Sequence, residues 1–109
     1  MRKLLALATV LVLAGVLAVT AVASTKTVSV KDNFFSPKST TISKNTTIKW
    51  KWAGSAPHNV TVTKGPQKFH SKTQTSGSFQ KKLKKAGTYK IVCTIHASQG
   101  MKMTLKVKK

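Results

Sequence analysis

Four side chains that bind soft transition metals lie in two short stretches of this 109-residue sequence. Cys93, His96 and Met101 fall within nine residues, with the spacing C-x2-H-x4-M, and His58 precedes Cys93 by 35 residues. One thiolate, two imidazoles and one thioether form the donor set that favours copper, with the methionine as a weak axial ligand. The four residues therefore predict a copper site.

The scarcity of acidic residues excludes several other kinds of site. The chain has 20 lysines and arginines but a single acidic residue, Asp32, and its formal net charge is +19. Hydrolysis of glycosides by paired carboxylates needs two acids, and protein cages for Ca²⁺ or Mg²⁺ need several oxygen anions. A Ser-His-Asp triad could use only Asp32. Chemistry by His, Cys and Met remains, as does binding by positive charge.

The N-terminal segment, residues 1–23, has the features of an export signal. A short basic start precedes an uncharged apolar run over residues 4–23, which ends on small residues, as at a signal-peptide cleavage site. Because 20 apolar residues can also span a bilayer, the run predicts either a cleaved signal peptide or an uncleaved membrane anchor. In both cases we expect residues 24–109 to be exported, to the periplasm, the cell surface or the medium.

Alternation of apolar and polar residues predicts an all-β fold for residues 24–109. Strands show this pattern when one face meets a core and the other meets water. Thr, Val, Ile and aromatic residues, which strands prefer, dominate these runs, and turn residues separate them. We predict one small domain, a Greek-key β-sandwich. The predicted strands are residues 27–31, 47–52, 58–63, 78–83, 88–93 and 101–108.

Two of the four candidate ligands occupy core-facing positions at strand ends. His58 shares a face with Val60 at the start of one predicted strand, and Cys93 shares a face with Ile91 at the end of another. The segment after Cys93 is predicted to be a loop, which can wrap several side chains around one point. Cys93 is the only cysteine, so no disulfide can form within the chain.

The remaining candidates for chemistry are interpreted as structural. Trp50, Trp52 and Met103 alternate inward and are predicted to be core residues, whereas His70 lies in the longest predicted loop and is predicted to be a surface histidine. The strand over residues 78–83 would place a lysine inward, which an edge strand tolerates.

Residues 24–109 resemble the cupredoxins, the small blue copper proteins of the plastocyanin and amicyanin type. The ligand loop has the length found in plastocyanin, while the gap before Cys93 is closer to that of amicyanin. The resemblance implies that His58, Cys93 and His96 are strong ligands of one copper ion, that Met101 is the axial ligand, and that Asn59 ties the two ligand loops together. The segments that carry it are residues 33–37, 46–52, 57–59 and 93–101.

The resemblance implies a function in electron transfer outside the cytoplasm. A type 1 copper ion that alternates between Cu(I) and Cu(II) would shuttle single electrons between redox partners. Four ligands leave no open position for a substrate, so we expect no enzymatic activity. The alternative is an exported protein for copper storage or delivery, which would use the same ligands.

Two further alternatives are less consistent with the residues. A basic module for nucleic acid or polyanions has the required charge but lacks a recognisable nucleic-acid motif, so we expect no nucleic-acid partner. A zinc site is disfavoured because tetrahedral zinc rarely uses methionine.

The positive charge itself predicts acidic partners. Residues 24–109 retain +17, since Arg2 and Lys3 precede them, and this charge exceeds the need for solubility. We expect a monomer that meets redox proteins with acidic docking surfaces, or an anionic membrane surface. With one carboxylate, the protein also lacks the usual route of acid denaturation, and protonation of the ligand histidines would set the limit.

Overall fold

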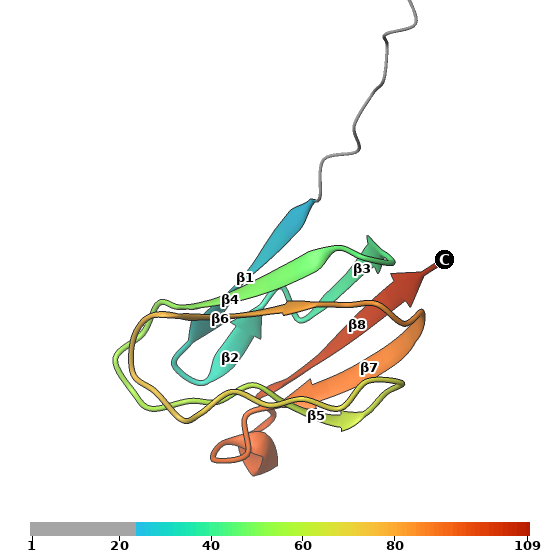
Figure 1. Ribbon diagram of the computed structural model, residues 1–109. Helices are drawn as coiled ribbons and strands as arrows, with labels where there is room; N and C mark the ends of the chain where they lie inside the picture. The colour runs from blue at the N-terminus through green and yellow to red at the C-terminus, as the bar shows by residue number, and fades with distance from the viewer. Residues whose placement is uncertain (1–23) are drawn as a thin grey trace, which may run out of the picture.

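Eight strands in two four-stranded sheets make up a β-sandwich in this computed structural model, which describes residues 24–109 (Figure 1). The predicted signal or anchor segment, residues 1–23, lies outside the described residues. The strands confirm the all-β prediction. They are β1 (Thr25–Lys31), β2 (Phe34–Ser36), β3 (Ser39–Ser43), β4 (Thr47–Trp52), β5 (Thr61–Lys64), β6 (Ser78–Lys82), β7 (Gly87–Val92) and β8 (Lys102–Lys108), with a short 3₁₀ helix, η2 (Ala97–Gln99), before β8.

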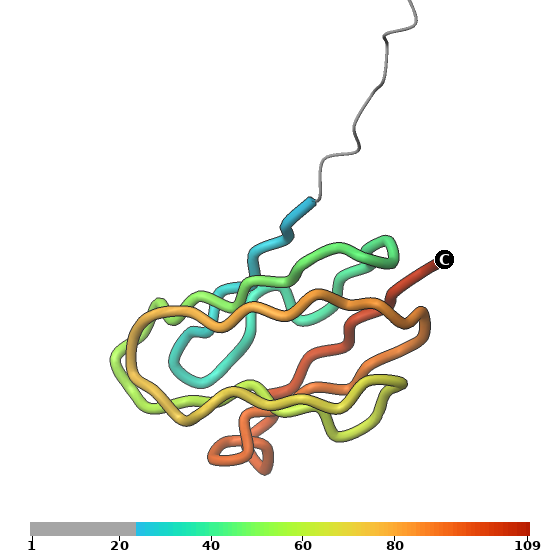
Figure 2. Tube along the Cα trace, in the orientation of Figure 1, coloured from blue at the N-terminus to red at the C-terminus, as the bar shows by residue number. Residues whose placement is uncertain are grey.

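The two sheets are mixed, and the chain passes repeatedly from one to the other (Figure 2). One sheet has the order β2-β1-β4-β6, and the other has the order β3-β8-β7-β5. The pairs β1–β4 and β3–β8 are parallel, and the remaining pairs are antiparallel. This connectivity brings β5, which follows His58, and β7, which precedes Cys93, side by side in one sheet. Within residues 24–109, no helix is long and apolar enough to cross a membrane.

The core is built from the inward positions of both sheets. Trp50 on β4 is fully buried, and its indole N–H donates to the Met103 sulfur of β8 across the sandwich, at 3.4 Å. Its ring lies 5.9 Å from that of Phe69 and 5.8 Å from that of Phe79, measured between centroids. Trp52 and Met103 are also buried, so the predictions that assign these three residues to the core are confirmed.

The strand predicted over residues 58–63 is shorter than expected. Regular pairing begins only at Thr61, and His58 forms an isolated bridge with Gln74. The Val60 N–H donates to the Ser71 hydroxyl at 2.9 Å in place of a neighbouring backbone. The partner here is the irregular segment 70–74, which offers single contacts and no continuous ladder. The predicted face is nevertheless right, because His58 and Val60 are both buried.

Two short strands, β2 and β3, were not predicted from the pattern. Each buries a single side chain below a tenth exposure, Phe35 in β2 and Ile42 in β3. One buried residue cannot establish a period of two, so the alternation that revealed the other strands is absent here.

The expected edge strand and surface histidine are both observed. β6 lies at the edge of its sheet, with Lys81 only partly buried and its ammonium 5.7 Å from the centre of the Phe69 ring. The longest connection follows β5, and His70 within it is exposed.

Candidate metal centre

Three of the four predicted ligands converge on one point at the end of the sandwich. His58 Nδ1 and His96 Nδ1 lie 3.8 and 3.7 Å from Cys93 Sγ, and the two ring nitrogens are 3.2 Å apart. Imidazole nitrogens and thiolate sulfurs bind a transition-metal ion at about 2.0 to 2.3 Å, so two ligand atoms of one ion must lie within about 4.5 Å of each other. The spacing of the three atoms therefore fits a single metal ion.

The loop between β7 and β8 holds Cys93, His96 and Met101 in a tight turn (Figure 1). Cys93 follows the last residue of β7, and its carbonyl accepts the His96 N–H at 3.1 Å. The Met101 N–H donates to the His96 carbonyl at 3.2 Å, and the Cys93 N–H donates to the Met101 carbonyl at 3.1 Å. Gly100 closes the turn with a φ of +92°, a conformation that favours glycine. Three backbone hydrogen bonds thus link the three residues directly.

Burial distinguishes His96 from the other three candidate ligands. The side chains of His58, Cys93 and Met101 belong to fully buried residues, whereas His96 is partly exposed and follows the exposed Ile95. Three of the four candidate ligands are therefore shielded from water, and His96 is the one that solvent can reach.

Asn59 connects the two ligand segments through its side-chain amide. Its Nδ2 donates to the hydroxyls of Thr94 at 2.8 Å and Thr73 at 3.1 Å. Its Oδ1 accepts the Thr94 N–H at 3.1 Å and the Thr61 hydroxyl at 2.9 Å. These bonds join the residue after His58 to the residue after Cys93, as the resemblance implied, and they fix the separation of the two ligand segments.

Asp32 is a site residue that the sequence analysis missed. Its Oδ1 lies 2.9 Å from His58 Nε2, on the side of the ring opposite the nitrogen that faces Cys93. The two residues are 26 positions apart and Asp32 sits in a polar turn, so no local pattern connects them. The sequence offered one signal for a special role of Asp32: it is the only acidic residue in a chain with 20 lysines and arginines.

The pKa of the Asp32 carboxyl is held well below its usual range by the Ser55 backbone N–H, the His58 imidazole and the Ala56 backbone N–H. A folded pKa below the unfolded value of about 3.9 stabilises the fold above that pH. The contribution is lost only as the pH falls further, toward the folded pKa. The single carboxylate therefore gives no cause for unfolding in mild acid.

We expect the melting temperature of the copper-loaded protein to stay nearly constant from about pH 7 to 5 and to fall only below about pH 4. Calorimetric melts across this range measure the effect. A control in 0.5 M salt separates the Asp32 contribution from the general repulsion among lysines, which salt screens. Unfolding at room temperature near pH 5 would contradict the expectation.

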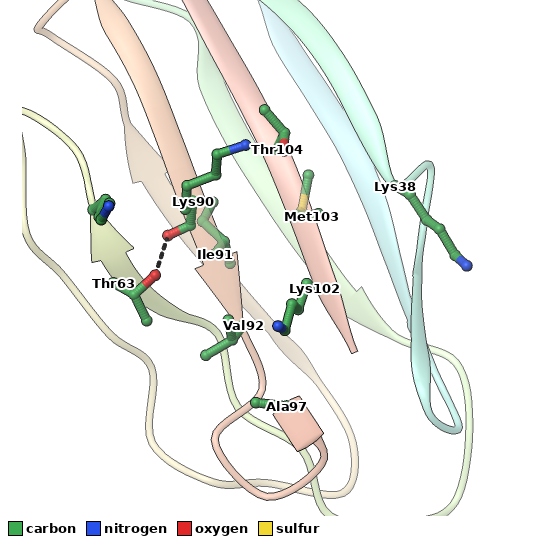
Figure 3. Close-up of a pocket in the computed structure, with 10 residues that line it drawn as sticks. Lys38, Thr63, Lys90, Ile91, Val92, Ala97, Lys102, Met103 and Thr104 are labelled. Carbon is green, nitrogen blue, oxygen red and sulfur yellow. Dashed lines mark hydrogen bonds between the residues drawn. The ribbon is translucent and has the colours of Figure 1, made fainter. Parts of the chain in front are cut away.

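A lysine-lined groove of about 540 Å³ lies on the sheet that contains β7 and β8 (Figure 3). Lys38, Lys90 and Lys102 lie around it, and the Thr63 hydroxyl donates to the Lys90 carbonyl at 3.2 Å. None of the four candidate ligands lines this groove. It is a basic surface feature and not the metal centre.

The donor set decides which metal the site suits. Two imidazole nitrogens and one thiolate match the preference of copper in both oxidation states. Met101, a buried residue whose backbone is hydrogen-bonded to Cys93 and His96, adds a thioether to the same loop. Hard cations such as Mg²⁺ and Ca²⁺ need oxygen ligands, and the only carboxylate is engaged with the far side of His58. The residues present therefore fit copper.

Comparisons with known proteins agree with this fit. Residues 22–108 match the family described as copper binding proteins, plastocyanin/azurin family. A sequence search of curated proteins found no match. Among solved structures, the chain is similar to oxidised plastocyanin from Dryopteris crassirhizoma, with 26% identity and a TM-score of 0.64 over 75% of this chain and 99% of the plastocyanin.

Two other solved structures show the same fold at lower identity. One is a purple cupredoxin from Nitrosopumilus maritimus, with 23% identity and a TM-score of 0.67 over 76% of this chain and 99% of the other. The second is a reduced amicyanin variant, with 18% identity and a TM-score of 0.68 over 82% of this chain and 86% of the other. With residues 22–108 matched and the donor atoms in place, copper is the cofactor, and the chain belongs to the plastocyanin/azurin family of copper-binding proteins.

Proposed function

We propose that this protein is a type 1 copper protein that carries single electrons between redox partners outside the cytoplasm. In this proposal His58, Cys93 and His96 are the strong ligands and Met101 is the axial ligand. The observation that carries it is the convergence of two ring nitrogens and one thiol sulfur, all within 4.8 Å of one another, at the buried end of a rigid sandwich.

The chain supports fast electron transfer by holding its ligands still. Copper, when bound, supplies a couple between Cu(I) and Cu(II). The Asn59 hydrogen bonds and the three backbone bonds of the ligand loop keep the donor atoms in place while the charge changes. Mixed nitrogen and sulfur donors suit both oxidation states moderately, so little rearrangement is needed. Partners would approach the metal most closely at His96, the partly exposed ligand.

The same arrangement supports a carrier and not an enzyme. His58, Cys93 and His96 converge on one point, and with Met101 as the fourth ligand in this proposal no coordination position would be left open for a substrate. Enzymes that use metals as catalysts keep such a position.

We also propose that residues 1–23 direct export and that residues 24–109 form the copper-binding domain. The apolar run over residues 4–23 supports this assignment. N-terminal sequencing of the protein recovered from cells separates a cleaved signal, which would begin the chain near Ser24, from a retained anchor.

Electrochemistry combined with copper extraction tests the carrier function against storage or delivery. A carrier shows a reversible one-electron wave and loses copper to a strong chelator over hours. A delivery protein exchanges copper within minutes and shows an irreversible wave. The second result would overturn the carrier proposal and favour the alternative.

The basic surface supports acidic redox partners. Eighteen lysines and one aspartate in residues 24–109 give +17, which steers anionic partners with rates that fall as salt rises. We expect oxidation of the reduced protein by hexacyanoferrate(III) to slow at least tenfold between about 10 and 200 mM salt. The matched control is a cationic cobalt(III) complex, which should react faster in salt. Equal salt responses of the two oxidants would contradict electrostatic steering.

A further inference from the structure

The one carboxylate of the chain is bound to a candidate copper ligand. Asp32 lies in the turn between β1 and β2, and its Oδ1 is 2.9 Å from Nε2 of His58. The His58 side chain has no exposed surface, whereas that of Asp32 is 38% exposed. The buried His58 ring is thus hydrogen-bonded to a carboxylate that reaches the solvent.

The segment after β4 is shaped around this carboxylate. The backbone N–H groups of Ser55 and Ala56 donate to its oxygens at 3.0 Å, and the Ser55 hydroxyl donates at 3.3 Å. A Cβ atom on Gly54 would overlap the carboxylate of Asp32, so only glycine leaves room for it. Four donors, with that of His58, therefore fix the position of one side chain.

This contact determines which nitrogen of His58 is free. An ionised carboxylate can only accept hydrogen bonds, so Nε2 must carry the proton. Nδ1 then presents a lone pair toward Cys93 Sγ and His96 Nδ1, at 3.8 and 3.2 Å. A histidine whose second nitrogen donates to a carboxylate is also a more basic metal ligand.

The negative charge of Asp32 also favours the higher oxidation state of a bound metal. All other charged side chains of residues 24–109 are lysines, and their positive charge disfavours the higher oxidation state of a bound metal. A single negative charge, one hydrogen bond away from the candidate ligand His58, opposes this effect close to the metal. We propose that Asp32 is a positioning residue that fixes the tautomer of His58 and favours Cu(II) over Cu(I). This inference rests on the proposed function.

Neutralising the carboxylate tests the proposal. In Asp32→Asn the affinity for Cu(II) should fall about 10- to 100-fold, the loss of metal affinity seen when such outer partners of metal-bound histidines are removed. The affinity for Cu(I) should fall less, so that the ratio of Cu(II) to Cu(I) affinity falls. Each tenfold change raises the reduction potential by about 59 mV for a one-electron couple. The matched control is Gln80→Lys, which changes the net charge by the same amount at an exposed position of β6, and it should shift the ratio less than about twofold.

A second variant moves the carboxylate without removing it. Gly54→Ala leaves every candidate ligand and charge in place but displaces Asp32 by steric conflict. It should shift the potential in the same direction as Asp32→Asn and alter the visible band. Potentials of both variants equal to that of Gln80→Lys would overturn the proposal.

A measurement on the wild-type protein needs no variant. Nitrogen-15 NMR of the Cu(I) form should show a slowly exchanging proton on His58 Nε2. An unprotonated Nε2 would overturn the proposal. A wild-type protein without a thiolate-to-copper band would instead overturn the proposed function, so the two failures are distinguishable.

Discussion

Replacing Cys93 with serine is expected to abolish the intense visible band of the copper-loaded protein. Such a band arises from charge transfer between a thiolate and Cu(II), and the serine hydroxyl is neither soft nor ionised at neutral pH. Cys93 is fully buried between His58 and His96, so serine fits the space and the fold should survive. Absorption and paramagnetic resonance spectra of the two proteins with equimolar Cu²⁺ measure the change.

The same loop offers a matched control for this substitution. Ser98 lies within η2, five residues after Cys93, and is exposed. Ser98→Ala should leave the band unchanged, because its side chain has no part in the site. A band of undiminished intensity in Cys93→Ser would remove the thiolate from the metal centre and contradict the ligand assignment.

Replacing Trp50 with alanine is expected to cost the metal-free protein about 3 to 5 kcal/mol of unfolding free energy. Trp50 is fully buried, spans the two sheets through its bond to Met103, and contacts the rings of Phe69 and Phe79. Domains of this size are stable by only about 5 to 15 kcal/mol. The melting temperature should therefore fall by about 12 to 40 °C, as denaturant and thermal unfolding can measure.

Two phenylalanine variants separate the hydrogen bond from the volume of the indole. The Trp50 N–H has a partner in Met103, whereas the buried Trp52 Nε1 has none in the described part of the chain. Trp50→Phe should therefore cost more than Trp52→Phe. Copper should partly restore the stability of Trp50→Ala, because a ligand that binds only the folded state stabilises that state by mass action. A loss below about 1 kcal/mol in Trp50→Ala would contradict its place at the centre of the core.

The parts of the fold that sequence predicts are those where one side of a strand meets a continuous core. β4, β7 and β8 each bury alternate residues, so their period of two is visible and their inward faces follow. β2 and β3 each bury one residue below a tenth exposure, and their pairing depends on strands distant in sequence. Such pairing leaves no local signal.

The site shows the same division between local and distant information. Cys93, His96 and Met101 share one loop, so their spacing alone suggested a common centre, and His58 was placed by its inward position. The structure brings His58, Cys93 and His96 together, and it buries Met101, whose backbone is hydrogen-bonded to those of Cys93 and His96. The contact between Asp32 and His58 joins the turn after β1 to the segment between β4 and β5. The spacing of residues in the sequence does not specify how these two segments pack.

Two polar side chains therefore hold His58 from different directions. Asn59 ties the adjacent backbone to Thr94, and Asp32 binds the ring itself. Because both partners are short side chains fixed by several hydrogen bonds, the ring has little freedom to rotate when a metal enters or changes its charge. Such rigidity favours electron transfer over copper exchange.

X-ray absorption at the copper edge of the loaded protein tests the central claim most directly, because it reports the atoms bound to the metal. We predict one sulfur and two imidazole nitrogens at about 2.0 to 2.3 Å, in both oxidation states, with small changes in distance between them. Nitrogen and oxygen ligands alone, or a sulfur at about 2.0 to 2.3 Å that persists in Cys93→Ser, would contradict the assignment of His58, Cys93 and His96 as ligands of one copper ion.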